Sequence, residues 1–216
     1  TSTLEDKIEV RMRNISKEFD GVQALSNVDF TIKGGEIHAL VGENGAGKST
    51  LVKILSGAIT ASKGTISING KVHNITSPRV SRDLGISVIY QEFVLARHLT
   101  VAENIFLDRL TDNKLGIINW NKLYREADEL LKKLGFDDIK SNQKVASLSV
   151  AYQQVVEICK SLSRNAKVLV LDEPSAVLTF SEIEKLFELL RGLKQQGIAI
   201  VYISHRLNEI FELCDT

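Results

Sequence analysis

Four short apolar runs constrain the fold of this chain more than any other feature of its sequence. Residues 36–41 (EIHALV), 86–90 (ISVIY), 168–171 (VLVL) and 198–204 (IAIVYIS) are apolar almost throughout. Such runs are typical of strands buried on both faces. Segments with helical spacing of apolar residues lie between them. We therefore expect an α/β fold, in which helices cover both faces of a mainly parallel sheet.

Three helices are predicted with clear ends. Asn119 can cap a helix that Gly135 can terminate. Thr179 and Glu182 fit a capping box at the start of a second helix, which Gly197 closes. A final helix is marked by Leu207, Ile210 and Phe211.

Antiparallel strands are predicted nearer the start of the chain. Residues 8–13 and 27–36 alternate apolar and polar side chains, and residues 65–75 form a hairpin pattern around Asn69-Gly70. These segments predict a second, antiparallel sheet beside the parallel one.

Composition excludes several classes of function. The 216 residues include 27 Lys or Arg and 27 Asp or Glu, so the formal net charge is zero. This balance argues against a surface that coats nucleic acid or lipid. The apolar runs are far shorter than the ~18 residues that span a bilayer, so we expect any work at a membrane to go through a partner. Cys159 and Cys214 form no C-x-x-C pair, and we expect both to be reduced core residues.

The segment GENGAGKS at residues 42–49 matches the phosphate-binding pattern G-x-x-x-x-G-K-[ST]. It follows a predicted strand and precedes a predicted helix, where that mechanism requires it. Glycines let the backbone N–H groups converge on phosphate oxygens, and the positive end of the helix adds to the attraction. Lys48 can reach the β- and γ-phosphates, and the Ser49 hydroxyl can ligate Mg²⁺.

A second acidic element follows the apolar run VLVL. Asp172 stands at the end of that run, where its carboxylate can hold Mg²⁺ through water. Glu173 is placed to polarise an attacking water. Two carboxylates that merely cap a strand would be the alternative, which the presence of GENGAGKS makes the weaker one.

Five further elements resemble the nucleotide-binding domain of ABC transporters and fall in the order of that family. Phe19 resembles the aromatic residue that stacks on adenine. Gln91 resembles the Q-loop glutamine, which touches Mg²⁺ and senses the membrane domain, and His205 resembles the switch histidine at the γ-phosphate. The segment 148–154 (LSVAYQQ) resembles the LSGGQ signature, and 175–179 (SAVLT) resembles the D-loop.

The resemblance covers essentially the whole chain. It implies a P-loop NTPase fold of ABC type, with a RecA-like core, an antiparallel β subdomain and an inserted helical subdomain at about residues 95–163. The implied ligands are ATP and Mg²⁺. Catalytic roles fall to Glu173, His205, Lys48 and Gln91, and metal contacts to Ser49, Gln91 and Asp172. Nucleotide contacts fall to Phe19, Gly42, Glu43, Asn44, Gly45, Ala46, Gly47, Lys48, Ser49, Thr50 and Ser149.

A narrower resemblance is to the ATPases of ribose/galactose-type monosaccharide importers, through the segments 91–107, 172–179 and 203–215. It implies that residues 1–216 are one nucleotide-binding domain, from the N-terminal part of a longer chain with a second such domain. The implied partners are membrane permease subunits, a second nucleotide-binding domain and, indirectly, an extracytoplasmic solute-binding protein, with no nucleic acid. The implied location is the cytoplasmic face of the plasma (inner) membrane.

The signature departs from the family pattern. Ser149 is kept, but Val150, Ala151 and Tyr152 replace Gly-Gly-Gln. A methyl at residue 151 hinders close backbone approach, and Tyr152 replaces an amide with a bulky ring. Either these replacements weaken a signature on which hydrolysis depends, or the signature serves a second ATP site that functions with a weakened signature. The resemblance favours the second interpretation, in which Lys48 and Glu173 use the signature of the partner domain.

Three other functions remain to be weighed. Another P-loop enzyme, such as a GTPase or a small-molecule kinase, is disfavoured; for the GTPase, neither NKLG nor NKLY supplies the Asn-Lys-x-Asp guanine motif. An ABC-type ATPase that acts on DNA or ribosomes is disfavoured by the neutral charge and by the absence of sustained heptads between Gln91 and Leu148. A nucleotide-binding module with little or no turnover is the remaining alternative.

Overall fold

The computed structural model describes residues 7–43, 47–92, 94–111 and 118–216. The chain divides into two compact units. Unit 1 contains Thr1–Tyr90, Ala166–Pro174 and Leu193–Thr216, and unit 2 contains Gln91–Asn165 and Ser175–Gly192.

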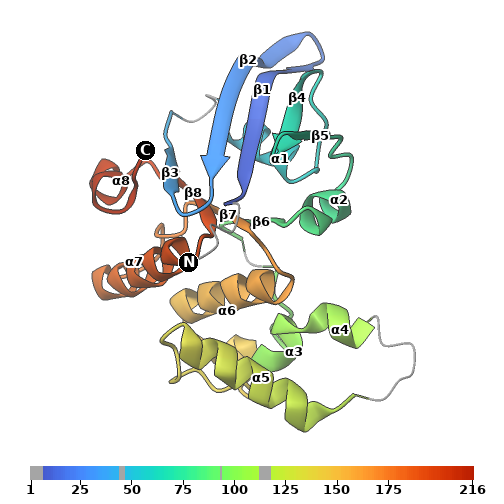
Figure 1. The fold of residues 1–216 in the computed structure, drawn as a ribbon. Helices are drawn as coiled ribbons and strands as arrows, with labels where there is room; N and C mark the ends of the chain where they lie inside the picture. Colours follow the sequence, from blue (N-terminus) through green and yellow to red (C-terminus); the bar gives the residue numbers. More distant parts are fainter. Residues whose placement is uncertain (1–6, 44–46, 93, 112–117) are drawn as a thin grey trace, which may run out of the picture. The chain divides into compact units, whose positions relative to one another are not determined.

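The parallel sheet belongs to unit 1 and confirms the prediction from the four apolar runs. Its strands are β3 (Ile37–Leu40), β6 (Ile86–Ile89), β7 (Val168–Asp172) and β8 (Ala199–Ile203), paired in the order β3-β8-β7-β6 (Figure 1). All three pairings are parallel. Every residue of β8 is buried, as are the first four residues of β7. Continuous burial explains why these strands read as apolar runs.

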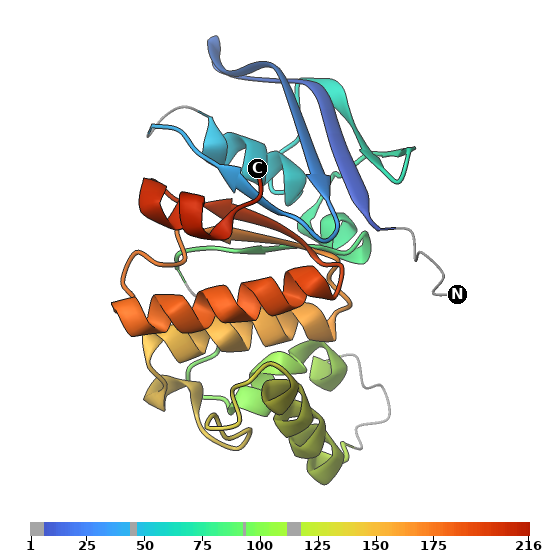
Figure 2. The same ribbon diagram turned by 60° about the vertical axis from the view of Figure 1, so that its left-hand side comes forward.

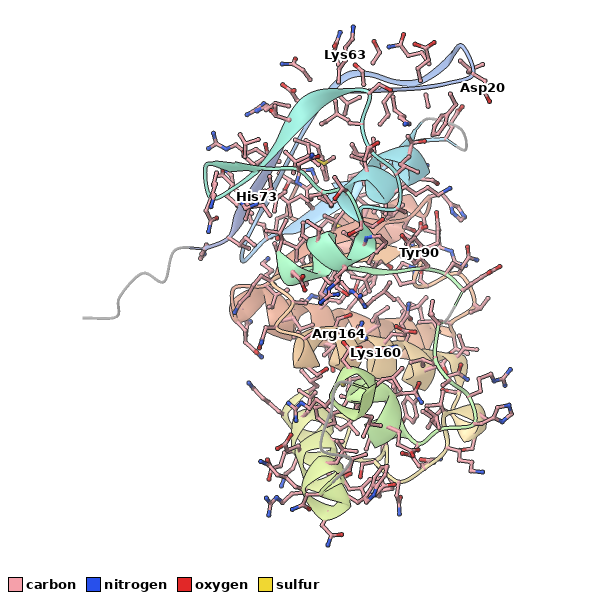
Figure 3. The ribbon with its side chains drawn as sticks, turned by 90° about the vertical axis from the view of Figure 1, so that its right-hand side faces the viewer. Asp20, Lys63, His73, Tyr90, Lys160 and Arg164 are labelled. Carbon is pink, nitrogen blue, oxygen red and sulfur yellow. The ribbon has the colours of Figure 1, made fainter. Side chains whose placement is uncertain are left out.

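The antiparallel sheet is also part of unit 1. The predicted hairpin around Asn69-Gly70 is confirmed, whereas the strands predicted at 8–13 and 27–36 extend over 9–19 and 22–33. The sheet has the order β2-β1-β4-β5. Its members are β1 (Glu9–Phe19), β2 (Val22–Lys33), β4 (Lys63–Ile68) and β5 (Lys71–His73). Asp20 marks the tip of the β1–β2 hairpin, and His73 lies on β5 (Figure 3). Asn69 and Gly70 join β4 to β5 with φ of 49° and 80°, which is the backbone of a type I′ turn.

Helix α1 (Lys48–Leu55) is central to unit 1 because both sheets contribute to the core around it. Its buried residues are Leu51, Val52, Ile54 and Leu55, and they belong to one apolar cluster with residues of β1, β4, β7 and β8. Figure 2 shows α1 between the antiparallel strands and the parallel sheet. The helix is therefore held on two sides, which fixes the position of its first residue, Lys48.

Unit 2 is helical and contains α3 (Val101–Ile105), α4 (Leu107–Thr111), α5 (Trp120–Lys133) and α6 (Val150–Ser163). It also holds a short 3₁₀ helix, η1 (Val145–Ser147), and most of α7 (Phe180–Gln195). Helix α3 packs against α5 and α6. The Asn119 side chain accepts a hydrogen bond from the Lys122 N–H, so the predicted cap of α5 is confirmed.

Two smaller helices complete unit 1. Helix α2 (Pro78–Asp83) begins with a proline after the Ser77 cap. Helix α8 (Leu207–Leu213) lies where the sequence predicts the final helix. Two of the apolar residues that marked it are exposed, however, and the helix buries Glu209 and Leu213 instead. Over the described ranges, none of the helices combines the length and hydrophobicity needed to cross a membrane.

Candidate active site

The phosphate-binding loop joins β3 to α1. Asn44, Gly45 and Ala46 lie outside the described residues, whereas Gly42 and Glu43 before them and Gly47 after them are described. Gly47 is the N-cap of α1 with φ of 92°. A Cβ at this position would lie 2.6 Å from the Leu25 Cδ2 and 2.9 Å from the Ala24 carbonyl oxygen. Glycine is therefore required at residue 47 by both backbone conformation and space.

The Lys48 side chain folds back over the start of the loop. Its Nζ donates hydrogen bonds to the carbonyl oxygens of Gly42 and Glu43, the second at 3.1 Å. The first N–H groups of a helix have no partner within the helix and carry partial positive charge. The start of α1, with exposed Ser49 and half-buried Thr50, therefore offers donors and a cation to one anion.

Two carboxylates stand at the carboxyl end of β7. Burial and the charge of Glu173 raise the pKa of Asp172, and Lys48 acts in the opposite direction. Leu40, at the end of β3, and Asp172 both pair with Ile203 of β8, so the loop that follows β3 starts at the same edge of the sheet as the end of β7. The Glu173 backbone has φ of 49°, in the left-handed region that residues other than glycine rarely adopt. Its N–H donates to the Ile203 carbonyl oxygen at 3.0 Å, which fixes the strained residue against β8.

His205 follows β8 and meets Glu173. Strands β7 and β8 pair in parallel, with Asp172 beside Ile203, so their carboxyl ends lie together. The His205 Nδ1 is 3.0 and 3.1 Å from the two carboxylate oxygens of Glu173. The His205 side chain is 69% exposed and that of Glu173 21%. The pair is thus open to solvent on the histidine side.

Phe19 is the predicted adenine-stacking residue and ends β1. Its side chain is 44% exposed. The Lys17 Nζ lies 5.1 Å from the centre of the ring, a cation–π contact. The exposed ring therefore carries a lysine over one of its faces.

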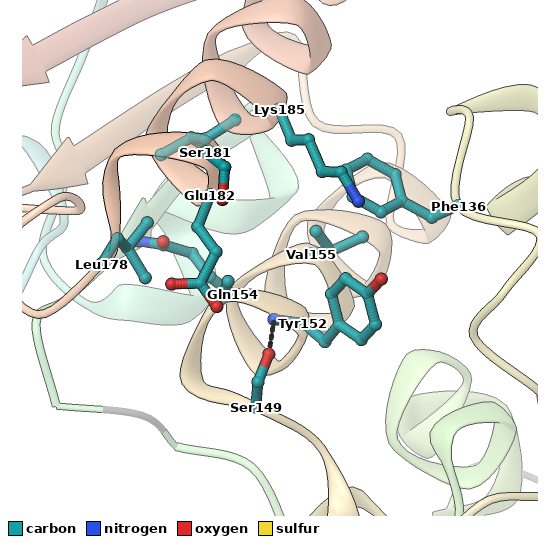
Figure 4. A pocket seen from close by; sticks show the side chains of 11 residues that line it. Phe136, Ser149, Tyr152, Gln154, Val155, Leu178, Ser181, Glu182 and Lys185 are labelled. Carbon is teal, nitrogen blue, oxygen red and sulfur yellow. Dashed lines mark hydrogen bonds between the residues drawn. The ribbon is translucent and has the colours of Figure 1, made fainter.

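Gln91 and Ser149 belong to unit 2. Gln91 is exposed and follows β6 and Tyr90. Ser149 is the N-cap of α6, and its Oγ accepts a hydrogen bond from the Tyr152 N–H at 3.3 Å (Figure 4). The signature serine therefore stands at a helix start, as the sequence predicts.

The Tyr152 ring has a structural partner within unit 2. Its hydroxyl donates to the Asp138 carboxylate, and its ring meets that of Phe136 edge-on, with the centroids 6.2 Å apart. The hydrogen bond to Asp138 raises the pKa of Tyr152 to about 12. This anchor of Tyr152 on Asp138 was missed in the sequence, because no spacing pattern connects the two residues.

A cavity of about 310 Å³ lies beside the signature, between α6 and α7. Figure 4 shows Tyr152 and Glu182 among the side chains that line it. Thr179 and Glu182 form the predicted capping box at the start of α7, with the Thr179 N–H 2.9 Å from the Glu182 Oε2. Thr179 thus has a structural role in the segment that resembles the D-loop.

Glu209 is a further residue that the sequence pattern did not single out. It lies four residues after His205 and is 3% exposed. Its carboxylate accepts hydrogen bonds from the hydroxyls of Tyr202 and Ser204. In the sequence, Leu207, Ile210 and Phe211 mark the buried face of α8, and this pattern gives no sign that Glu209 is buried instead.

The predicted residues of unit 1 therefore converge. Lys48, Asp172, Glu173 and His205 come from the start of α1 and the ends of β7 and β8. This arrangement places helix-start donors and a lysine beside two carboxylates and a histidine. It can bind a phosphate-bearing ligand with a cation, and it offers a carboxylate to orient water.

Comparisons with known proteins all point to one family, the ABC transporters. The model of the ABC transporter family matches residues 25–176. Among curated proteins, the chain is 51% identical over 209 residues to the xylose import ATP-binding protein XylG of Thermoanaerobacter pseudethanolicus. It is 50% identical over 208 residues to the ribose import ATP-binding protein RbsA of Chromobacterium violaceum. Each match covers 96% of this chain but only 41% of the relative.

Solved structures show the same likeness in three dimensions. The ADP conformation of MJ1267, an ATP-binding cassette of an ABC transporter, matches with a TM-score of 0.84 at 27% identity, covering 96% of this chain and 85% of that one. The dimeric ATP-binding cassette MJ0796 bound to ADP and Pi matches with a TM-score of 0.76 at 27% identity, covering 93% and 89%.

Proposed function

The chain belongs to the ABC transporter family, and from this premise we propose that it binds and hydrolyses ATP to power import of a small solute through a membrane permease. A monosaccharide is the proposed solute, because the relatives at 50% and 51% identity are named for ribose and xylose import. The convergence of Lys48, Asp172, Glu173 and His205 in unit 1 is the observation that carries the ATPase assignment.

ATP is proposed to bind on the loop between β3 and α1. The backbone from Gly42 to Thr50, including Glu43 and the residues 44–46, would surround the phosphates, with Lys48 neutralising their charge. The side-chain nitrogen of Lys48 already bonds carbonyl oxygens of this loop. The exposed ring of Phe19 would stack on adenine.

The residues at the end of β7 suit a magnesium ion. Burial and the neighbouring Glu173 charge both disfavour the ionised form of Asp172, so a divalent cation there would relieve a local excess of negative charge. Mg²⁺ takes oxygen ligands and commonly uses one or two carboxylates together with substrate phosphates. Ser49, Asp172 and Gln91 are the residues proposed to hold it. When bound, the ion would offset phosphate charge.

Hydrolysis is proposed to depend on Glu173 and His205. Glu173 would orient water for attack on the γ-phosphorus, and its strained backbone and bond to Ile203 hold the carboxylate in one place. His205 and Lys48 would stabilise the charge that develops on the phosphate. The existing contact between His205 and Glu173 keeps the two groups within reach of one reacting centre.

A second nucleotide-binding domain, in the same or another polypeptide, is proposed to complete each site. Ser149 and the start of α6 would face the phosphate bound by the partner domain. Gln91 would connect ATP state to the permease, at the cytoplasmic face of the plasma (inner) membrane. A solute-binding protein outside the membrane would deliver the solute.

A module with little turnover is the second candidate, favoured by one observation. Ala151 and Tyr152 replace the small residue and the amide of the signature, and Tyr152 is held by Asp138. If this signature served the site that contains Lys48, hydrolysis there would be slow. The two candidates differ in turnover and agree in ATP binding.

Two substitutions test the proposal in the full-length protein assembled with its partners. Lys48→Ala should lose most ATP affinity, and the exposed Lys53→Ala on the same helix should keep it. Glu173→Gln should retain ATP binding and nearly abolish hydrolysis, whereas Glu184→Gln, exposed on α7, should not. Turnover at the wild-type rate in Glu173→Gln would remove Glu173 from its role, and ATP binding without turnover in the wild type would favour the second candidate.

A further inference from the structure

His205 lies in the short segment that connects β8 to α8, and its exposed side chain adds little to the packing of that segment. The ring is 69% exposed, and its Nδ1 contacts Glu173, a residue that the proposed reaction itself uses. The position of the ring therefore depends on the backbone between β8 and α8. Ser204 before it is completely buried, and Arg206 after it is half-buried.

A single buried carboxylate binds this connection on both sides of the histidine. The Glu209 Oε2 accepts hydrogen bonds from the Tyr202 hydroxyl at 2.8 Å and from the Ser204 Oγ at 3.3 Å. Its Oε1 accepts a hydrogen bond from the Arg206 guanidinium at 3.3 Å. The Ser204 Oγ in turn accepts from the Arg206 N–H at 3.0 Å. The bonds thus join Glu209 to residues one and three before His205 and to the residue after it.

Burial of a glutamate is costly, which indicates that this arrangement serves more than packing. The Glu209 side chain is 4% exposed, and that of its ion-pair partner Arg206 is 38% exposed, so the glutamate is the buried member of the pair. A buried ion pair is commonly replaceable by apolar residues without loss of stability, whereas removal of one partner is destabilising. An apolar residue at position 209 could fill the space, but it could not hold the hydroxyl of Ser204 or the guanidinium of Arg206.

We propose that Glu209 is a positioning residue for ATP hydrolysis, which acts by fixing the backbone of His205 so that the imidazole stays within reach of Glu173 and of the phosphate. The inference rests on the proposed function. Glu209 itself touches neither nucleotide nor water in this role. Its loss should therefore lower the rate of the chemical step and leave ATP binding by Lys48 intact.

The test uses the full-length protein assembled with its partners. Glu209→Gln keeps the size of the side chain but removes its charge, so the bond to Arg206 is weakened. We expect kcat to fall between about 10-fold and about 100-fold, the range that a small misplacement of a catalytic group produces. The KM for ATP should not change. The control is Glu212→Gln, an exposed glutamate of the same helix, for which kcat should match the wild type.

A double substitution separates positioning from general destabilisation. If Glu209 acts through His205, then Glu209→Gln should add no further loss of kcat to His205→Ala, because the group that it positions is already gone. Independent, multiplying losses would overturn the inference. So would a change in the KM for ATP equal to the change in kcat.

A milder variant covers the case in which Glu209→Gln does not fold. Tyr202→Phe removes one hydroxyl from the Glu209 carboxylate and keeps the buried ring. It should lower kcat in the same direction by a smaller factor, with the same dependence on His205, and wild-type kcat in this variant would overturn the inference. The proposed function would instead be overturned if the wild-type protein showed no ATP turnover that Lys48→Ala abolishes. The failure of the inference and the failure of the proposed function are therefore distinguishable.

Discussion

Glu173 is held in a backbone conformation that carries strain. Its φ of 49° belongs to the left-handed region, and a non-glycine residue there costs on the order of 1–3 kcal/mol. The hydrogen bond from its N–H to the Ile203 carbonyl oxygen and the contact of its carboxylate with His205 hold Glu173 in this conformation. Strain of this kind is concentrated at functional sites, which agrees with the role proposed for Glu173.

Gly47 permits a prediction about the phosphate-binding loop. Gly47→Ala places a methyl group 2.6 Å from the Leu25 Cδ2 and forces a residue other than glycine to a φ of 92°. We expect the free energy of unfolding to fall by about 1–3 kcal/mol and ATP affinity to fall with it, as measured by thermal unfolding and nucleotide titration.

Gly192 offers the matched control, because it lies in α7 and a Cβ there meets no described atom within 4 Å. Gly192→Ala should raise stability by about 0.5–1 kcal/mol, since alanine is the better helix residue. Equal effects of the two substitutions would contradict the assignment of a special role to Gly47.

Asp172 permits a prediction about pH. Burial and Glu173 raise the pKa of this carboxyl in the folded protein. A raised pKa means that its contribution to stability is fully present below its ordinary pKa and is lost as pH rises through the raised value. At neutral pH the ionised Asp172 therefore lowers stability in the absence of ligand, and Asp172→Asn should raise the Tm of the nucleotide-free protein.

The same substitution should remove the extra stabilisation that Mg²⁺ adds to ATP, which thermal unfolding with and without the metal will show. Asp83→Asn, at an exposed position of α2, is the control and should keep it. A lower Tm for nucleotide-free Asp172→Asn would show that Asp172 is stabilising and would contradict the pH argument.

At the scale of the secondary-structure element, helix α6 combines a core stripe with the signature. The side chains of Val155, Val156 and Cys159 are each at most 3% exposed. At its start, Ser149 caps the helix and Tyr152 binds Asp138. The Tyr152 side chain, at the position where the family signature has Gln, therefore has a bond that positions the end of the helix.

Tyr152→Gln tests which ATP site this signature serves. The change restores the family amide but breaks the bond to Asp138, so we expect stability to fall by about 1 kcal/mol. Turnover in the full-length assembly should not rise, because the Lys48 site would use the signature of the partner domain. Measurements of kcat and Tm show whether this signature serves the Lys48 site. Tyr124→Gln on α5 is the control for the loss of a tyrosine.

A clear rise in kcat on Tyr152→Gln would show that the signature limits the site at which it acts. The interpretation of a tolerant second site would then be wrong, and the weakened signature would explain slow turnover.

The elements themselves were largely predictable, and the reason is physical. Fully buried strands need continuous apolar runs, and caps need particular side chains, so β7, β8, α5 and α7 follow from local sequence. The site residues at strand ends were also predictable, because parallel strands bring their carboxyl ends together. The roles of Glu209 and Asp138 were not, since each depends on a tertiary contact that no spacing rule encodes.

At the scale of the whole molecule, the proposed site is incomplete in one domain. Unit 1 holds Lys48, Asp172, Glu173 and His205, and in the proposed mechanism the signature that completes this site belongs to a second nucleotide-binding domain. The chain spans 41% of the length of the xylose-import relative. A separate domain should therefore differ from the assembly in turnover more than in binding.

We expect residues 1–216 alone to bind ATP in a manner that Lys48→Ala abolishes, but to hydrolyse it slowly. Addition of a complementary nucleotide-binding domain should raise the rate, because closure of two domains supplies the second signature. Nucleotide titration and phosphate release measure the two quantities. Fast release by a protein that stays monomeric at all concentrations would contradict the paired arrangement.

The strand order β3-β8-β7-β6 has a consequence for biosynthesis. The two outer strands leave the ribosome first, and the two inner ones, from Val168 and Ala199 onward, emerge only after helices α3 to α6 have been made. Until then β3 and β6 have unpaired backbone edges, which invite association between nascent chains. Chaperone demand during translation should therefore be greatest before β7 emerges and should end when β8 fills the centre.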